Sequence, residues 1–134
     1  MSKQQALANV RQYLADGHFE ADLRRRVAIR SESQNPGQAH ELTRYLQQEI
    51  QPALAGMGFE CQMLDNPSGA GPLLFASRHE GADLPTVLMY GHGDVVLGYD
   101  EQWREGLSPW ALTVEGDRWY GRGTADNKGQ HSIN

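Results

Sequence analysis

A histidine and an aspartate two positions apart are the first side chains in this sequence that could do chemistry. They lie in Gly91 to Asp94 (GHGD), directly after the most continuous apolar run of the chain. In extended backbone, residues i and i+2 project to the same side. A carboxylate there can accept the second N–H of the imidazole and strengthen it as a metal ligand. The two glycines would leave room for an ion or a substrate to approach. The alternative is a simple turn that contains an incidental histidine.

A second candidate segment, Gly121 to Gln130 (GRGTADNKGQ), surrounds Asp126 with glycines. A carboxylate can bridge two divalent ions about 3.5–4 Å apart, so Asp126 could belong to a shared metal site. Asp126 could instead cap the helix that follows. A phosphate-binding loop is a third interpretation, because Gly, Arg, Thr and Lys all occur here. The spacing matches neither the Walker pattern nor the dinucleotide fingerprint, which disfavours that third interpretation.

Taken together, residues 90–96 (YGHGDVV), 103–110 and 120–129 (YGRGTADNKG) resemble the zinc amidohydrolase and peptidase family of acetylornithine deacetylase, succinyl-diaminopimelate desuccinylase, aminoacylase and the cytosolic dipeptidases. The resemblance implies that His92 is a zinc ligand and that Asp126 bridges two metal ions. It places Asp94 among the catalytic residues, as the carboxylate that orients His92. The implied cofactor is a pair of Zn²⁺ ions, with Co²⁺ or Mn²⁺ as alternatives. The peptide bond after Asp126 would be cis.

Other residues of these motifs are expected to be structural. Arg122 and Lys128 would hold the loop, and Trp103 and Trp110 would pack the segment between the motifs. The family's general-base glutamate, its remaining metal ligands and its smaller dimerisation domain cannot be placed before Asn134. We therefore expect residues 1–134 to be the N-terminal portion of a catalytic domain, truncated and without the lid domain.

Hydrophobic periodicity predicts the elements that would position these motifs. Apolar spacing predicts helices over 6–14, 19–27 and 38–54, and Pro52 is expected either to kink the last helix or to mark the restart of a helix. Strands are predicted at 59–64, 73–77 and 86–90, and the unbroken apolar run 86–90 is typical of a central strand buried on both faces. The fold class is α/β, and the family resemblance implies a three-layer α/β/α zinc-exopeptidase-like domain, of which this chain is the N-terminal part.

Composition narrows the choice of partners and compartment. The chain has 134 residues and a net charge of −5, which disfavours binding to a nucleic-acid backbone. No apolar run is long enough to cross a membrane, and the polar start lacks a secretory signal. The one cysteine, Cys61, is expected to be a small buried residue in a strand, and its lack of a partner fits a cytoplasmic protein.

The remaining candidate residues have simpler interpretations. The arginines at 24–26 could bind an anion, although an exposed helix face is the more common role for such a run. Surface positions are expected for three histidines and three glutamates, namely His18, His40, His79, Glu101, Glu105 and Glu115. His131 is expected in a helix that begins after Asp126. Ser31 and Ser33 lack His and Asp partners in sequence, so a serine hydrolase is unsupported.

Two functional hypotheses follow. The first is a two-zinc hydrolase of amide bonds whose substrate is a small peptide or acylated amino acid, in a family that is often homodimeric. The second is a non-catalytic truncated fragment that has no activity of its own. A metal-independent binding module is a more distant alternative.

Overall fold

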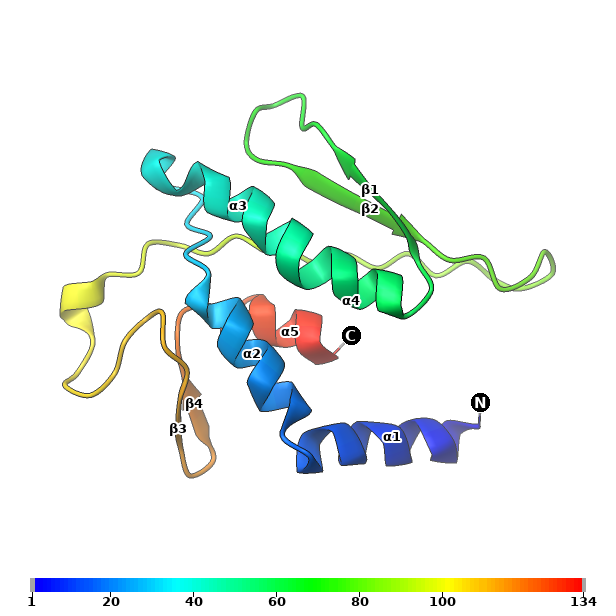
Figure 1. Cartoon of the computed structure of the whole chain (residues 1–134), viewed down its shortest axis with the longest axis horizontal. Coiled ribbons are helices and arrows are strands. Elements are labelled where there is room, and N and C mark those ends of the chain that lie inside the picture. Colours follow the sequence, from blue (N-terminus) through cyan, green and yellow to red (C-terminus); the bar gives the residue numbers. More distant parts are fainter. Residues whose placement is uncertain (1, 134) are drawn as a thin grey trace.

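The first half of the chain is mostly helical, and two short hairpins and a final helix follow. The computed structural model describes residues 2–133. The helices are α1 (Lys3–Ala15), α2 (His18–Ala28), η1 (Pro36–Gln38), α3 (Ala39–Tyr45), η2 (Leu46–Ile50), α4 (Gln51–Gly56), η3 (Asp100–Gln102) and α5 (Lys128–Ile133). The strands are β1 (Glu60–Leu64), β2 (Leu73–Ser77), β3 (Thr113–Glu115) and β4 (Arg118–Tyr120). Figure 1 shows α5 beside α2, although the two helices are far apart in sequence.

The three helices expected from periodicity are confirmed. The third spans α3, η2 and α4 as one nearly continuous rod, and η2 is a π-helical turn. Pro52 lies in the first turn of α4. Because proline has no N–H to donate to the preceding turn, the irregular turn falls directly before it, and α4 begins there as the expected helix restart.

The strand predictions are confirmed for β1 and β2 and wrong for residues 86–90. The first two strands form an antiparallel hairpin with Glu60 opposite Ser77 and Leu64 opposite Leu73. The second hairpin, β3 with β4, was not predicted because each strand has three residues, too few to show a period of two.

Residues 86–90 run as an extended segment past α3 and α4 (Figure 1) and belong to no strand. The exposed fractions are 78% for Val87, 91% for Leu88, 62% for Met89 and 86% for Tyr90, so the expected burial is absent. The physical reason is that no strand within residues 2–133 pairs with this segment. The chain is therefore a mixed α/β structure with two separate antiparallel hairpins, and the three-layer arrangement stays a prediction.

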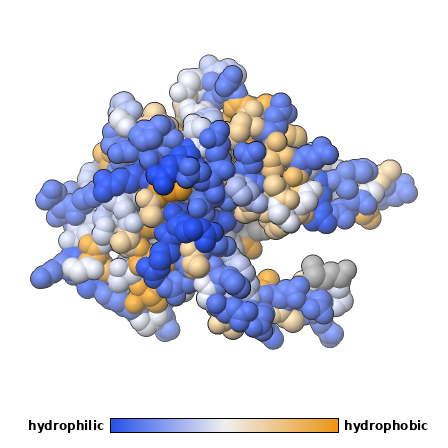
Figure 2. Space-filling view, in the orientation of Figure 1, coloured by the Kyte–Doolittle hydropathy of each residue, from blue (hydrophilic) through white to orange (hydrophobic). Residues whose placement is uncertain are grey.

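Helix α1 projects away from the other helices in Figure 1 and contributes little to the core. Its apolar residues Leu7, Val10 and Leu14 are 48–57% exposed. In Figure 2, apolar residues reach the surface in several patches between larger hydrophilic areas. Within residues 2–133, no helix combines the length and the apolar character that crossing a membrane requires.

The core lies between α2 and the β3–β4 hairpin. Leu23 and Val27 of α2 pack with Leu112, and Phe19 and Trp119 cover this cluster. The contact matters for the site because β4 leads directly into the loop that carries Asp126.

The expectation of an exposed arginine face holds for two of the three arginines. Arg24 pairs with Glu20, and Arg25 pairs with Asp22; both arginine side chains are about half exposed. Arg26 is only 4% exposed, and its guanidinium donates to the Ser132 hydroxyl of α5. Arg26 is buried because α5 packs on this side of α2. The sequence pattern of α2 alone does not show which of its faces another helix covers.

Candidate metal centre

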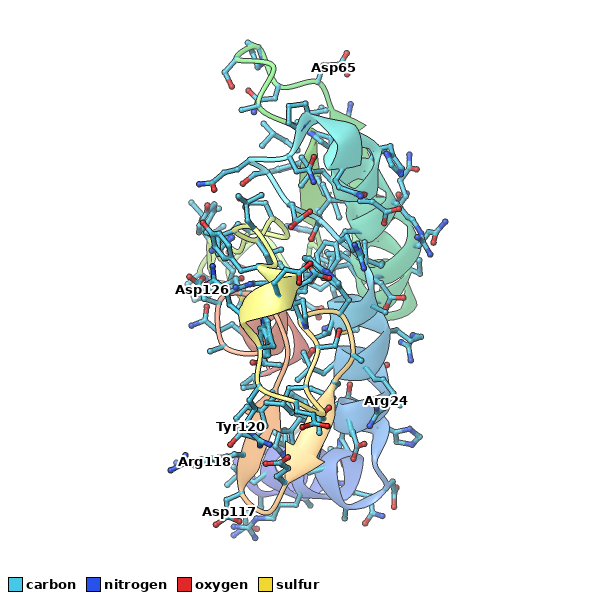
Figure 3. All side chains as sticks on the ribbon, turned by 90° about the vertical axis from the view of Figure 1, so that its left-hand side faces the viewer. Arg24, Asp65, Asp117, Arg118, Tyr120 and Asp126 are labelled. Atoms are coloured by element: carbon cyan, nitrogen blue, oxygen red, sulfur yellow. The ribbon has the colours of Figure 1, made fainter. Side chains whose placement is uncertain are left out.

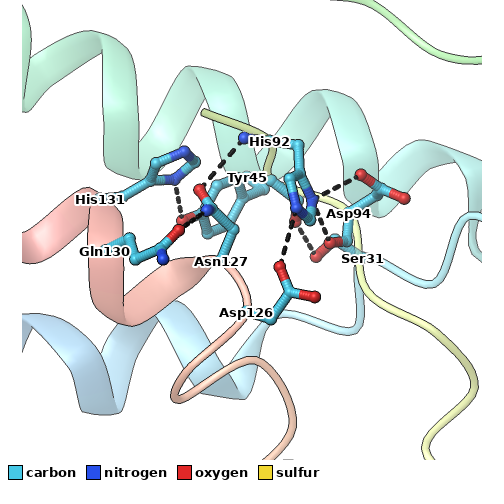
Figure 4. Close-up of polar contacts among 9 residues, drawn as sticks. Ser31, Tyr45, His92, Asp94, Asp126, Asn127, Gln130 and His131 are labelled. Carbon is cyan, nitrogen blue, oxygen red and sulfur yellow. Dashed lines mark hydrogen bonds and ion pairs between the residues drawn. The ribbon is translucent and has the colours of Figure 1, made fainter. Parts of the chain in front are cut away.

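Two side chains from distant parts of the sequence meet at one edge of the molecule. The His92 Nε2 atom lies 2.9 Å from the Asp126 Oδ1 atom (Figure 4). The Asp126 side chain is 83% exposed and the His92 side chain 34% exposed, so both reach solvent. An imidazole nitrogen and a carboxylate oxygen are both zinc ligands, with bond lengths of about 2.0–2.2 Å. The structure thus brings together the two residues expected to bind metal.

Asp94 lies against the other nitrogen of the same imidazole. The distance from His92 Nδ1 to Asp94 Oδ1 is 3.1 Å, and that to the Asp94 backbone oxygen is 3.2 Å. If Nδ1 carries the proton, both contacts hold it there and leave the lone pair of Nε2 available to a metal ion. The contact agrees with the spacing, and the role of Asp94 in orienting a metal ligand stays a prediction.

The side chain of Asn127 also joins the two loops. The His92 amide donates to Asn127 Oδ1 at 3.2 Å, and the Asn127 side-chain amide donates to Gln130. The peptide bond between Asp126 and Asn127 is cis, as the family resemblance implied. Asn127 therefore ties the histidine segment to the start of α5, a role that its residue type alone did not indicate.

The glycines beside His92 serve a different purpose from the one expected. A Cβ atom on Gly93 would lie 2.3 Å from the Tyr45 ring, and one on Gly91 would lie 2.2 Å from the His131 ring. The missing side chains therefore face the protein and make no room for an ion or a substrate. The sequence did not show this because Tyr45 and His131 are distant from the motif.

Beneath this turn lies a buried polar group of Tyr45, His131 and Lys128. The Tyr45 hydroxyl and His131 Nδ1 are 2.9 Å apart, and Tyr45 is fully buried. Lys128 Nζ donates to the Ile29 carbonyl at 2.6 Å and lies 5.1 Å from the centre of the Tyr45 ring. Burial lowers the pKa of Lys128 to about 7, although Glu41 opposes this shift. These contacts support the expectation that Lys128 has a structural role.

The segment between the motifs is held as expected. Trp103 Nε1 and the Arg122 guanidinium both donate to the Gly98 carbonyl, at 2.8 Å and 3.2 Å. Arg122 lies over the Trp103 ring, and Trp110 is buried with its N–H directed at Asp100. Arg122 also lines an open pocket of about 300 Å³, together with His92, Asp94 and Asp126.

The remaining candidate residues lie elsewhere. His18, His40, His79, Glu101, Glu105 and Glu115 are exposed, as expected, and Cys61 is half buried in β1. Within residues 2–133, no group of three or more His, Cys, Asp or Glu side chains is arranged to hold a metal ion. The described residues thus supply His92 and Asp126 as a pair, with Asp94 behind the histidine. Figure 3 shows Asp126 well away from the acidic residue Asp117 of the β3–β4 turn.

His131 makes the stability of this region pH-dependent. Burial, followed by the positive charges of Arg26, His92 and Lys128, lowers the pKa of His131 from 6.5 to about 4. The unfolded chain therefore binds more protons between these two values. Stability from this group is complete above about pH 6.5 and is lost as the pH falls towards about 4. After allowance for partial exposure, we expect a loss of about 2 kcal/mol.

Urea unfolding of the wild type and of His131→Gln at about pH 7 and about pH 4.5 measures this loss. The wild type should lose more stability than His131→Gln over this interval. His79→Gln is the control, because His79 is exposed and its removal should leave the pH dependence of the wild type unchanged. Equal losses in the wild type and His131→Gln would contradict the assignment.

Comparison with known proteins finds similarity to members of the family that the motifs resemble. The model described as Peptidase family M20/M25/M40 matches residues 88–133. Succinyl-diaminopimelate desuccinylase of Gluconobacter oxydans is 44% identical over 80 residues, which cover 57% of this chain and 19% of the relative. A probable di- and tripeptidase of Saccharomyces cerevisiae is 36% identical over 77 residues, which cover 51% of this chain and 8% of the relative.

A solved structure shares the fold. The chain matches that of Dug1p, a di-peptidase from Saccharomyces cerevisiae, with a TM-score of 0.70 and 21% identity over 86% of this chain and 26% of that chain. At this identity the match shows the fold alone. The chain spans about a fifth of the length of the desuccinylases it matches, at 19% and 20%.

Proposed function

Residues 88–133 make this chain a relative of Peptidase family M20/M25/M40, and from that premise we propose that it supplies part of a metal site for the hydrolysis of amide bonds. The observation that carries the proposal is the 2.9 Å separation between His92 Nε2 and Asp126 Oδ1. Two ligand atoms this close, each able to bind zinc at about 2.0–2.2 Å, can reach the same ion. The pocket beside them is open to solvent and could admit a substrate.

The residues fit a divalent cation in charge as well as in position. Both nitrogens of His92 face carboxylates, Asp94 at 3.1 Å and Asp126 at 2.9 Å. We propose that Asp94 holds the proton on Nδ1 and orients the ring, while His92 and Asp126 bind metal, with Asp126 free to share its second oxygen with another ion. When bound, two Zn²⁺ ions, or Co²⁺ or Mn²⁺, would polarise the scissile carbonyl and acidify water.

The proposed substrates are small peptides or N-acyl amino acids. The relatives named above are a desuccinylase and a di- and tripeptidase, and all of these activities break an amide bond. The pocket is bordered by Arg122, a fixed positive charge that suits the carboxylate of such a substrate. Homodimerisation, which the family resemblance implies, is proposed only for a longer chain that includes the smaller domain.

A second candidate is that residues 1–134 alone are non-catalytic and belong to a larger catalytic domain. Two observations favour it. Residues 2–133 hold no cluster of three metal-ligating side chains, and the extended apolar segment 86–90 has no pairing strand among them. The two candidates are compatible, because a metal-binding half-site can exist without turnover. Hydrolysis of a dipeptide or an N-acyl amino acid by this chain with added Zn²⁺ would exclude the second candidate.

Removal of the Asp126 carboxylate should weaken metal binding. We expect Asp126→Asn to bind Zn²⁺ at least about tenfold more weakly than the wild type, because an amide carries no charge and is a poorer zinc ligand. Calorimetric titration of the full chain with Zn²⁺ measures the change. Asp117→Asn is the matched control, because it removes another exposed carboxylate far from the pocket (Figure 3) and should leave the affinity unchanged.

The two variants together decide the proposal. Equal Zn²⁺ affinity in the wild type and Asp126→Asn would refute the metal role of Asp126. Equal losses in Asp126→Asn and Asp117→Asn would indicate general electrostatic attraction and would also refute a specific site.

A further inference from the structure

The segment that follows α2 contacts the turn that carries His92 through both its side chains and its backbone. We propose that Ser31 and Glu32 are positioning residues, which clamp residues 93–98 so that His92 and Asp94 face the pocket. This inference rests on the proposed metal-binding function. Neither residue touches the pocket, and a serine followed by a glutamate in a polar turn has no chemical signature in the sequence.

Ser31 binds the turn at the position between the two functional side chains. It is fully buried, and its hydroxyl donates to the Gly93 carbonyl at 2.6 Å (Figure 4). Gly93 lies between His92 and Asp94, so this bond holds the peptide group that links them. The Ser31 hydroxyl is itself buried, and the Gly93 carbonyl is the acceptor that satisfies it, so the bond joins the two segments at this position.

The backbones of the two segments are also paired. Val95 donates to the Ser31 carbonyl at 2.8 Å, and Ser33 donates to the Val95 carbonyl at 3.1 Å. These bonds form an isolated parallel bridge between Glu32 and Val95. Successive residues of extended chain project to opposite sides. Since Gly93 and Val95 are held against the protein, His92 and Asp94 are directed outward to the pocket.

Glu32 extends the clamp beyond the bridge. Its side chain is 6% exposed, and one carboxylate oxygen accepts the Gly98 amide at 2.7 Å. The other oxygen accepts the Asn35 side-chain amide at 3.0 Å. Gly98 in turn offers its carbonyl to Arg122 and Trp103, so Glu32 links the clamp to the loop that borders the pocket. Both carboxylate oxygens are used, and an uncharged substitute cannot accept at both.

Because Ser31 and Glu32 act through the His92 turn, their removal should loosen the turn and weaken metal binding. Loss of a partner that orients a metal ligand commonly lowers affinity 10–100-fold, and we expect about a tenfold loss of Zn²⁺ affinity for Ser31→Ala. Amide hydrogen exchange at Val95 and Gly98 should become faster in Ser31→Ala. In Ser33→Ala, the matched control, an exposed hydroxyl is removed and both readouts should stay at wild-type values.

Two further variants separate positioning from general stability. Glu32→Gln keeps the shape of the side chain and should speed exchange at Gly98, which tests the clamp even if Ser31→Ala fails to fold. Ala76→Gly weakens the β1–β2 hairpin, which contributes no residue to the pocket or to the His92 turn. It should lower the free energy of unfolding and leave Zn²⁺ affinity unchanged. If Ser31→Ala acted only through general stability, both variants would lose Zn²⁺ affinity.

The outcomes are distinguishable. If exchange at Val95 and Gly98 is the same in Ser31→Ala and Ser33→Ala, the clamp is overturned, whatever the metal result. Faster local exchange with unchanged Zn²⁺ affinity overturns the positioning role. If the wild type binds no Zn²⁺, the proposed function fails and the coupling to metal fails with it, while the exchange data still decide whether the clamp exists.

Discussion

Replacing Gly129 with alanine is expected to destabilise the folded chain by more than about 3 kcal/mol, the largest effect we expect from a single methyl group. A Cβ atom on Gly129 would lie 2.0 Å from the Thr124 carbonyl oxygen and 3.1 Å from the carbonyl carbon. Both are backbone atoms, so no side-chain rotation can relieve the overlap. The loop must move or α5 must detach.

The loop has little freedom to move. The Thr124 amide and hydroxyl both donate to the Gly121 carbonyl, and the Gly129 amide donates to the Gly123 carbonyl. Displacing Thr124 would therefore disturb the segment that presents Asp126. We expect Gly129→Ala to lose Zn²⁺ binding together with stability, since both depend on the same loop.

Urea or thermal unfolding measures the effect of Gly129→Ala, with Gly56→Ala as the matched control. Gly56 also lies in a helix, and a Cβ there would meet no atom within 4 Å. Alanine is a better helix former than glycine by about 1 kcal/mol, so Gly56→Ala should be neutral or stabilising. A Gly129→Ala variant as stable as the wild type would show that α5 does not pack on the loop in this way.

Gly93→Ala is expected to cost about 2–3 kcal/mol and to weaken Zn²⁺ binding. Its Cβ would lie 2.3 Å and 2.5 Å from two carbons of the Tyr45 ring. Tyr45 is fully buried, and its hydroxyl is bonded to His131, so the ring cannot turn aside without breaking that contact. The strain falls on the residue next to His92, which is why the metal site should suffer as well.

A double-mutant cycle tests the cause. Tyr45→Leu removes the ring that the new methyl group would strike, so Gly93→Ala should cost less in a Tyr45→Leu background than in the wild type. The free energies of unfolding of the four proteins give the coupling. Additive effects of the two changes would mean that Gly93 is required for a reason other than its contact with Tyr45.

Much of the local structure was predictable because it depends on neighbouring residues. Helical periodicity identified α1, α2 and the rod from α3 to α4, and Pro52 marked its irregular turn. Strand character identified β1 and β2. Periodicity could not reveal β3 and β4, because each strand has only three residues. Their pairing depends on the tight turn between them and on packing against α2.

The apolar run at 86–90 shows the limit of such reasoning. Its composition predicts a buried strand, and Leu88 is instead 91% exposed. Burial is a property of the strand and its partners together, and no partner lies within residues 2–133. The segment has the sequence of a central strand without the sheet that would make it one.

What the sequence alone determined is which candidate groups are present: an imidazole with a carboxylate two residues on, and a second carboxylate in a glycine-rich loop. These depend on residue type and short spacing. Only the tertiary structure showed why the residues around His92 are of the types they are. Gly93 is small because of Tyr45, and Ser31 matters because its hydroxyl meets the Gly93 carbonyl 62 residues away. Contacts between distant segments leave no local pattern, so these roles became visible only once the chain was folded.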